Sequence, residues 1–344
     1  MTWPTIFSTL LSRRSLDNVE AVWAMDQIMS GEASPAQVAG FLMALRAKGE
    51  TVEEMRGLAD TMLAHASRIE VAGVTLDIVG TGGDRAHTVN ISTMASLLAA
   101  ASGVRVVKHG NRASSSSSGS ADVLEALGIN LALPPSVVAA VAEQAGITFC
   151  FAQQFHPAMR HAASARRDLG IGTAFNFLGP LTNPAQPTYA AVGVADARMA
   201  PLMAGVFAGR HKDAAVFRGD DGLDELTIST TSKVWWVRSG GVREYEVDPT
   251  SVGLELQPVE TLRGGDAAYN AQVVLDVFAG APGPVRDAVV LNAGVALALT
   301  VPDRGESQAA FTQGLQSGMD RARAAIDDGS AASVLQKWVT ATRA

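Results

Sequence analysis

A glycine-rich turn between an apolar segment and a helix is the first stretch of the sequence that could do chemistry. Residues 76–79 read as a short buried strand, and the turn after it holds Gly80, Gly82 and Gly83 before Asp84. Glycines let a backbone approach an anion closely, while N–H groups and a helix N-terminus supply donors and partial positive charge. Since the spacing matches neither a Walker A nor a Rossmann motif, the turn predicts a phosphate site of another type.

A second polar loop, KHGNRASSSSSGSAD, follows another apolar strand and occupies residues 108–122. Its serine hydroxyls and glycine amides suit phosphate oxygens, and Lys108 and Arg112 add charge-assisted donors. A flexible linker is the alternative interpretation of a Ser/Gly run. That alternative is the weaker one here, because KHGNR comes directly after a buried strand. His109 taken alone is more often a structural hydrogen-bonding residue than a catalyst.

The third candidate is an acidic loop, RGDDGLDELT, at residues 218–227. We interpret Asp220 and Asp221 as a solvated turn. Asp224 and Glu225 differ if they face the phosphate loops, because bare carboxylates beside a polyphosphate require a bridging cation. Hard oxygen ligands together with phosphate select Mg²⁺.

A fourth segment, residues 153–185, carries Arg160, Arg166 and Arg167 around a predicted helix. An arginine there could hold a carboxylate through two parallel hydrogen bonds. A single arginine on such a helix is more often a solvent-facing charge. The residues alone leave the choice among the three open.

The elements that must position these loops divide into two kinds. Residues 1 to about 70 read as helices, with capping boxes at residues 34–37 and 51–54. Strand-like and helical runs then alternate, which predicts a largely parallel sheet covered by helices. A hairpin at residues 233–247 is expected at one edge, and two helices, near 267–278 and 307–327, are expected to close the chain. In such sheets ligands bind beyond the carboxyl ends of the strands, so the three loops should converge.

Composition excludes several classes of protein. The 344 residues carry a net charge of -7, which argues against a nucleic-acid reader. The single cysteine, Cys150, allows no intrachain disulfide, and its apolar context predicts a buried thiol. No signal peptide is recognisable, and the run AVVLNAGVALAL is too short to span a bilayer. We therefore expect a cytoplasmic protein without a membrane segment.

Taken together, the loops fit group transfer from a pyrophosphorylated sugar. No Ser-His-Asp arrangement and no zinc-ligand spacing is recognisable in the sequence. Catalysis is then expected to depend on positioning and electrostatics rather than on a covalent intermediate.

The motifs GTGGD, TVNIST, KHGNR with SGSADVLEALG, FHPAM, NFLGPLTNP and GLDELT occur in this order over nearly the whole chain. In this order and spacing the sequence resembles anthranilate phosphoribosyltransferases, which join anthranilate to phosphoribosyl pyrophosphate in tryptophan biosynthesis. A pyrimidine nucleoside phosphorylase of related fold is one alternative, and phosphorolysis of thymidine or uridine would support it. A non-catalytic nucleic-acid-binding relative is another, against which the net charge and the Asp224-Glu225 pair argue.

The resemblance implies an α/β fold with a small helical domain and a larger α/β domain whose central sheet is mostly parallel, as in nucleoside phosphorylases and phosphoribosyltransferases. The helical domain would comprise residues 1–70, joined by helices from about 160–185, and the phosphoribosyl-pyrophosphate-binding domain residues 71–344. It also implies a homodimer, and it admits association with a glutamine amidotransferase subunit.

The resemblance further implies residue roles, with Lys108, Asn111 and Arg166 as catalytic residues. Mg²⁺ would be held by Ser92, Asp224 and Glu225. Anthranilate would meet Gly80, Asn111 and Arg166, with His109, His156 and Pro180 lining its approach. Phosphoribosyl pyrophosphate would contact Gly80, Gly83, Asp84, Thr88, Asn90, Ile91, Ser92, Thr93, Lys108, His109, Gly110, Asn111, Arg112, Ala113, Ser114, Ser115, Ser116 and Ser120.

One departure from the family pattern concerns the serine run. Many members have Lys where this chain has Ser117. We expect the loss of that charge to have a modest effect on pyrophosphate binding. Residues 85–87 replace smaller residues, and we expect this replacement to have no effect on function.

The implied reaction is displacement at the anomeric carbon through a cation-like transition state, with domain closure excluding water.

Overall fold

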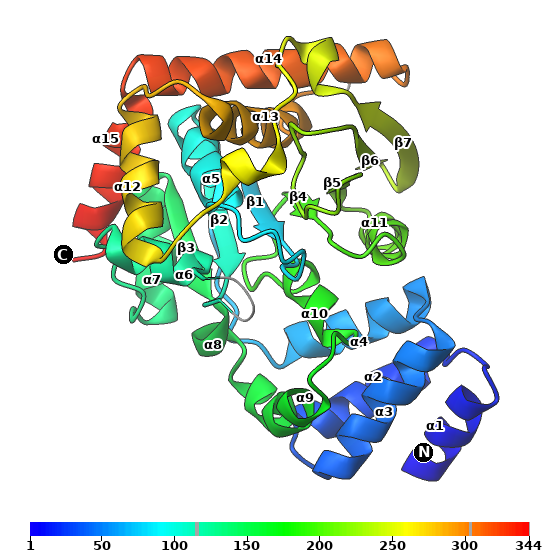
Figure 1. Cartoon of the computed structure of the whole chain (residues 1–344). Helices are drawn as coiled ribbons and strands as arrows, with labels where there is room; N and C mark the ends of the chain where they lie inside the picture. Colours follow the sequence, from blue (N-terminus) through cyan, green and yellow to red (C-terminus); the bar gives the residue numbers. More distant parts are fainter. Residues whose placement is uncertain (114–116, 303–304, 344) are drawn as a thin grey trace.

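The computed structural model describes residues 1–113, 117–302 and 305–343, and it shows a helical bundle beside a larger α/β region (Figure 1). The α/β region is built on a seven-stranded sheet of order β3-β2-β1-β4-β5-β6-β7. Strands β1 to β5 are parallel, and β6 and β7 continue the sheet as an antiparallel hairpin. The strands are β1 Thr75–Gly80, β2 Arg105–Gly110, β3 Ile147–Phe151, β4 Tyr189–Gly193, β5 Asp213–Gly219, β6 Ser232–Arg238 and β7 Gly241–Val247.

Side chains alternate between the two faces of this sheet, as a strand requires. Ile78 and Phe217 belong to a core that packs under α5 and α13, whereas Val79 and Val216 belong to a second core shared with α11 and the helical bundle. The helices around the sheet are α5 Ile91–Ala101, α6 Ser120–Ala126, α7 Pro135–Ala145, α8 Ala152–Phe155, α11 Met199–Gly209, α12 Ala267–Phe278, α13 Pro284–Leu299, α14 Gln308–Asp327 and α15 Ser330–Ala341.

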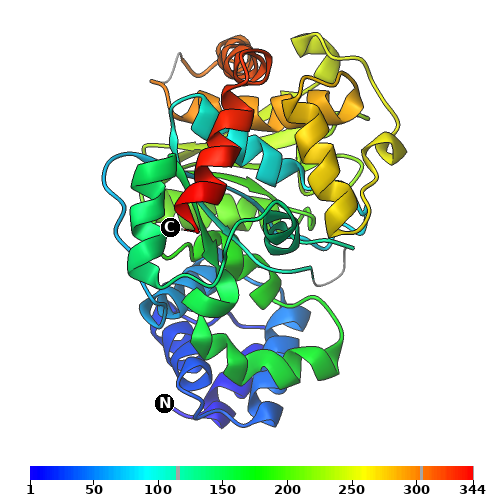
Figure 2. The same ribbon diagram turned by 90° about the vertical axis from the view of Figure 1, so that its left-hand side faces the viewer.

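The helical bundle consists of α1 Trp3–Leu11, α2 Asn18–Met29, α3 Pro35–Lys48 and α4 Val52–Ala64. Both predicted capping boxes are present, at the starts of α3 and α4, and Gly49 ends α3 with φ 92°. Segments from mid-chain pack onto this bundle. These are η1 Pro157–Ala162 against α2, α9 Ala163–Leu169 against α3, and α10 Phe175–Leu178 against α4 (Figures 1 and 2).

The two helices predicted near 267–278 and 307–327 are confirmed as α12 and α14, but the C-terminal part holds two further helices, α13 and α15, that were not predicted. The apolar run between α12 and α14 forms helix α13, which is buried against α5 and α14, and α15 follows α14 almost directly. The start of α15 carries no side-chain cap, since Gly329 precedes it in the left-handed region with φ 77°. Without a capping residue, the sequence holds no local signal for that boundary.

None of the helices in the described ranges is both long and apolar enough to cross a bilayer.

The strand register places the ends of the central strands side by side. Gly80 pairs with Gly193, which pairs with Phe217, and Gly110 pairs with Phe151 on the other side. The loops after β1, β2, β4 and β5 therefore leave the sheet at a common edge, where a ligand site is expected.

Candidate functional site

The glycine turn and the acidic loop are in direct contact. The N–H of Gly82 donates a 2.6 Å hydrogen bond to Oδ2 of Asp224, 142 residues away in the sequence. Gly82 and Gly83 have φ of 70° and 90°, which favours glycine. A Cβ at Gly80 would lie 2.3 Å from the same Asp224 oxygen, so only glycine admits this approach.

Lys108 and the start of α5 complete the contact between loops. Oε1 of Glu225 accepts a 3.1 Å bond from the N–H of Ser92, in the first turn of α5, where the helix dipole favours negative charge. Nζ of Lys108 donates to the carbonyl of Ile78 and lies 3.4 Å from Oγ of Ser92. The glycine turn, the end of β2 and the acidic loop therefore meet at one place.

Buried charges of both signs characterise this place. Burial raises the pKa of Asp224 well above its usual range, and nearby Asp84 and Glu225 add to the effect. Burial also raises the pKa of Glu225 to about 7, although Lys108 opposes it. The pKa of Lys108 is lowered by burial, against the attraction of Asp77, Glu225 and Asp224. Three carboxylates thus face one buried ammonium.

Hard oxygen donors next to a single cation fit a divalent ion such as Mg²⁺. Within the described residues, no three His, Cys, Asp or Glu side chains converge closely enough to hold an ion by themselves. Ser92, Asp224 and Glu225 could therefore supply part of a shell that oxygens of a ligand complete, which is how Mg²⁺ is commonly held beside phosphates.

Both side-chain and backbone groups of the segment between the glycine turn and α5 could contact a ligand. Asn90 donates from Nδ2 to the carbonyl of Ser118 at 3.1 Å, which ties this segment to the serine loop. The hydroxyl of Thr93 is buried and has no hydrogen-bond partner among the described residues. The side chain of Ile91 packs into the core, so Ile91 can offer a ligand only its backbone. The backbone of Thr88 forms an isolated β-bridge with Arg263.

The serine loop is only partly described, because Ser114, Ser115 and Ser116 lie outside the described residues. A Cβ at Gly110 would lie 2.7 Å from Oγ of Ser120, so these two predicted residues are neighbours. Asn111 is exposed, and its Oδ1 accepts from the N–H of Arg112.

Arg112 does not join the buried cluster of charges. Its guanidinium donates to both carboxylate oxygens of Glu125 and to Asp122, and it lies over the ring of Phe151. The N–H of Ala113 also donates to Asp122, at 3.0 Å. The start of α6 thus holds this part of the loop.

A neutral, imidazole-lined surface adjoins the charged one. His109 and His156 are buried with ring centroids 5.1 Å apart. Nδ1 of His109 is 2.9 Å from the carbonyl of Gly179, which precedes buried Pro180. Because that carbonyl only accepts, Nδ1 carries the proton and Nε2 the lone pair. Burial lowers the pKa of His109 to about 3 and that of His156 to about 4, so both rings are neutral near pH 7.

Of the three arginines left open by the sequence, Arg166 alone is partly buried. Arg160 and Arg167 are exposed, and Arg160 donates to its own turn at Pro157. The guanidinium of Arg166 lies 5.6 Å from the ring centroid of Phe175, and burial lowers its pKa with no charged neighbour contributing. A half-buried cation with no ion pair among the described residues is suited to an anionic group from outside the chain.

Four buried polar residues around the site were missed by the sequence interpretation. Asn292 accepts from the N–H of Leu226 and donates to its carbonyl, both at 2.9 Å, next to Glu225. Asn270 donates to Asn90, and Asn183 donates to Asp77. Two of these residues could have been found from the sequence, because each is a lone polar residue in an apolar run: Asn292 in AVVLNAGVALAL and Asp77 in TLDIV. A polar side chain buried in such a run needs a hydrogen-bond partner.

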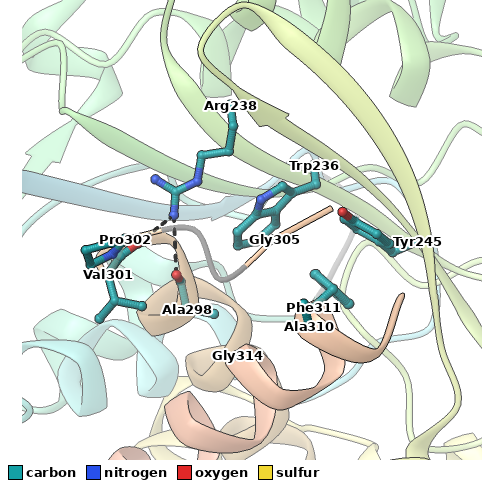
Figure 3. A pocket seen from close by; sticks show the side chains of 10 residues that line it. All are labelled: Trp236, Arg238, Tyr245, Ala298, Val301, Pro302, Gly305, Ala310, Phe311 and Gly314. Carbon is teal, nitrogen blue, oxygen red and sulfur yellow. Dashed lines mark hydrogen bonds between the residues drawn. The ribbon is translucent and has the colours of Figure 1, made fainter. Parts of the chain in front are cut away.

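A separate pocket lies at the opposite end of β5 and β6, where Arg238 donates to Asp213. Figure 3 shows Trp236 and Tyr245 beside Phe311, with Arg238 directed at the carbonyls of Ala298 and Val301. Its volume of about 20 Å³ is room for roughly one water molecule. Arg238 also donates to the carbonyl of Leu299, so it satisfies carbonyl groups at the C-terminal end of α13.

Comparison with known proteins agrees with this geometry. Residues 4–66 match the helical bundle domain of a glycosyl transferase family, and residues 72–332 match its a/b domain. The anthranilate phosphoribosyltransferase of Nocardioides sp. is 60% identical over 99% of both chains. The crystal structure of the Thermus thermophilus enzyme has a TM-score of 0.90, with 39% identity over 98% of this chain and 99% of that one.

Structures of a less similar protein were solved with ligands bound. Anthranilate phosphoribosyltransferase from Saccharomyces cerevisiae in complex with PRPP and Mg has a TM-score of 0.89 and 26% identity, over 99% of this chain and 98% of that one. The same yeast protein was solved in complex with 4-fluoroanthranilate, with a TM-score of 0.87, 25% identity and the same coverage.

Proposed function

The chain belongs to the anthranilate phosphoribosyltransferase family, and on that premise we propose that it transfers the phosphoribosyl group of 5-phosphoribosyl 1-pyrophosphate to the amine of anthranilate. The products are N-(5-phosphoribosyl)anthranilate and pyrophosphate, in tryptophan biosynthesis. The observation that carries this proposal is the meeting of Gly82, Ser92 and Lys108 with Asp224 and Glu225 at one edge of the sheet.

The donor half of the site comprises the glycine turn, the start of α5, Lys108 and the acidic loop. Its backbone N–H groups and the dipole of α5 suit phosphate oxygens. Lys108 places a buried ammonium where charge on departing pyrophosphate would develop. When bound beside Ser92, Asp224 and Glu225, Mg²⁺ would supply Lewis-acid stabilisation of that leaving group. The predicted donor contacts remain part of this proposal, with Arg112 as a weak one because its guanidinium is paired with Glu125 and Asp122.

The acceptor half comprises Arg166, Asn111, the two histidines and Pro180. Arg166 is free of ion pairs with the described carboxylates and would hold the carboxylate of anthranilate. The amine of anthranilate is neutral near pH 7, so it can attack without a strong general base. Neutral His109 and His156 suit such a nucleophile, because imidazolium groups beside it would oppose the positive charge that develops on nitrogen.

The site draws residues from both parts of the chain. We divide the chain near residue 70, with the segment at about 160–185 joined to the helical bundle. Arg166 on α9 packs with that bundle, whereas Lys108 and Glu225 extend from the sheet. Closure of one part on the other would bring donor and acceptor together and exclude water, which would otherwise hydrolyse the donor.

For assembly, we propose a homodimer that acts in the cytoplasm, with a glutamine amidotransferase subunit as a further partner. The homodimer follows from membership of the family.

The test is the loss of anthranilate fluorescence when purified protein is mixed with phosphoribosyl pyrophosphate, with Mg²⁺ and with a chelator. The proposal predicts a loss that needs both the donor and the cation. Unchanged fluorescence with both present, or phosphorolysis of thymidine or uridine instead, would contradict it.

A further inference from the structure

A buried carboxylate whose hydrogen bonds come from amide groups, and which Lys108 stabilises only through its charge, lies beside the acceptor half of the site. Asp77 is 1% exposed in the middle of β1, and burial raises its pKa to about 6. Both of its oxygens accept from amide groups rather than from a cation. Burying a carboxylate costs free energy, which an apolar side chain at the same position of the strand would avoid. A buried Asp at this position therefore indicates a specific role.

The hydrogen bonds of Asp77 join three segments that are distant in sequence. Oδ1 accepts from the backbone N–H of His109 at 3.0 Å, at the end of β2. Oδ2 accepts from Nδ2 of Asn183 at 2.8 Å, and the same Nδ2 donates to the carbonyl of Val107 at 2.8 Å. Asp77 thus ties the end of β2 to the segment that follows the 3-10 turn η2, Gly179–Leu181.

That segment and the end of β2 form the two walls of the proposed acceptor site. His109 and Asn111 belong to one wall, and Gly179 and Pro180 to the other. The walls also touch directly, through Nδ1 of His109 and the carbonyl of Gly179 at 2.9 Å. Thr182 reinforces the second wall, because its hydroxyl donates to the carbonyl of Leu178 at 2.9 Å.

From these contacts we infer that Asp77 and Asn183 are positioning residues that hold the two walls of the acceptor site at a fixed separation. Neither residue needs to touch anthranilate, because each acts through the backbone of His109 or through the turn that carries Pro180. The inference rests on the proposed function, since it assigns these walls to the acceptor.

Isosteric variants separate this role from a purely structural one. In Asp77→Asn one oxygen becomes an amide nitrogen, so either His109 N–H or the Asn183 amide meets a second donor. In Asn183→Asp a second carboxylate faces Asp77. The double variant restores one pairing, because the amide of residue 77 can donate to the carboxylate of residue 183. The matched control is Thr148→Val, which removes a buried 2.8 Å bond to the carbonyl of Val138 on α7.

The experiment measures KM for anthranilate and for phosphoribosyl pyrophosphate, together with thermal unfolding, for wild type and all four variants. Losing a buried bond to a charged group predicts a KM for anthranilate raised about tenfold or more in Asp77→Asn. The KM for the donor should rise less than the KM for anthranilate, because Asp77 acts on Lys108 through its charge alone and not through a hydrogen bond. The double variant should have a lower KM for anthranilate than Asn183→Asp. Thr148→Val should lower thermal stability and leave both KM values unchanged.

Each other outcome has a defined meaning. Equal rises in both KM values, lower stability with both KM values unchanged, or a double variant no better than Asn183→Asp would overturn the inference. If Asp77→Asn does not fold, Asn183→Asp and the double variant still give the comparison. Where turnover is too slow, calorimetric titration with each substrate replaces the KM values. Wild type that fails to consume anthranilate overturns the proposed function instead.

Discussion

The donor and acceptor halves of the site lie side by side, but the donor half buries charged side chains and the acceptor half buries neutral imidazoles. In the donor half Asp224, Glu225 and Lys108 are all buried, and backbone N–H groups of Gly82 and Ser92 hold the carboxylates. In the acceptor half His109 and His156 are buried and neutral.

The chain buries charged side chains where a charged ligand is expected and neutral ones where a neutral amine is expected. A polyphosphate and its cation bring charge that can neutralise the donor half when they bind, so the carboxylates there can be costly without a ligand. A neutral amine brings no such charge, and the acceptor half accordingly keeps its imidazoles unprotonated and concentrates its cation in Arg166. Substitutions in the donor half should therefore change the kinetic constants for phosphoribosyl pyrophosphate, and substitutions in the acceptor half those for anthranilate.

The largest expected effect comes from Glu225→Gln, which keeps the shape of the side chain and removes its charge. Removing one electrostatic group from such a site lowers turnover by about a hundredfold or more. The effect should be on kcat/KM for phosphoribosyl pyrophosphate and on the Mg²⁺ concentration needed, measured by fluorescence with each varied in turn. An equal increase in KM for anthranilate would show that the halves are not separable.

Arg166→Ala should act on the other half. Loss of a hydrogen-bonded ion pair predicts a KM for anthranilate about tenfold to a hundredfold higher, with the KM for the donor nearly unchanged. Arg167→Ala is the matched control, because Arg167 is the exposed neighbour and should leave both constants at their wild-type values. The assignment fails if the two variants behave alike.

The two halves should also change stability in opposite directions with pH. Glu225 has a raised pKa of about 7, so its burial costs stability progressively as pH rises from about 4.5 to 7. His156 has a lowered pKa of about 4, so its burial costs stability as pH falls from about 6.5 to 4. Each contributes on the order of 3 kcal/mol across its window.

Urea denaturation between pH 4.5 and 7.5 checks this contrast. Relative to wild type, Glu225→Gln should gain free energy of unfolding as pH rises, and His156→Gln should gain it as pH falls. Parallel curves for the two variants would contradict the opposite electrostatics of the halves.

The smallest effect is expected from Arg112→Gln. Its guanidinium is held by Glu125 and Asp122 at an exposed position, and exposed ion pairs are worth about 0–1 kcal/mol. The KM for the donor should change by less than about threefold. A much larger rise would mean that Arg112 leaves these carboxylates and joins the donor half during turnover.

The sequence predicts well what depends on neighbouring residues. The capping boxes before α3 and α4, the glycine turn after β1 and the edge hairpin of β6 and β7 each carry a local signal, and each is confirmed. The convergence of the loops also follows, because parallel strands end at a common edge.

The remaining features depend on contacts between distant segments. Nothing near Asp77 in the sequence indicates Asn183 as its partner, and nothing near Leu226 indicates Asn292. The choice of Arg166 over Arg167 depends on how α9 packs against the bundle, which helical spacing alone cannot decide. Helix α15 was missed because it packs on α5 and α7 and its start has no side-chain cap.

The central claim is that a divalent cation binds at Asp224 and Glu225 together with the donor. Electron paramagnetic resonance with Mn²⁺ tests it directly, on wild type, on an Asp224→Asn/Glu225→Gln double variant and on Arg166→Ala. We expect bound Mn²⁺ in wild type and in Arg166→Ala when phosphoribosyl pyrophosphate is present, and no bound Mn²⁺ in the double variant. Mn²⁺ bound to the double variant with wild-type affinity would contradict it.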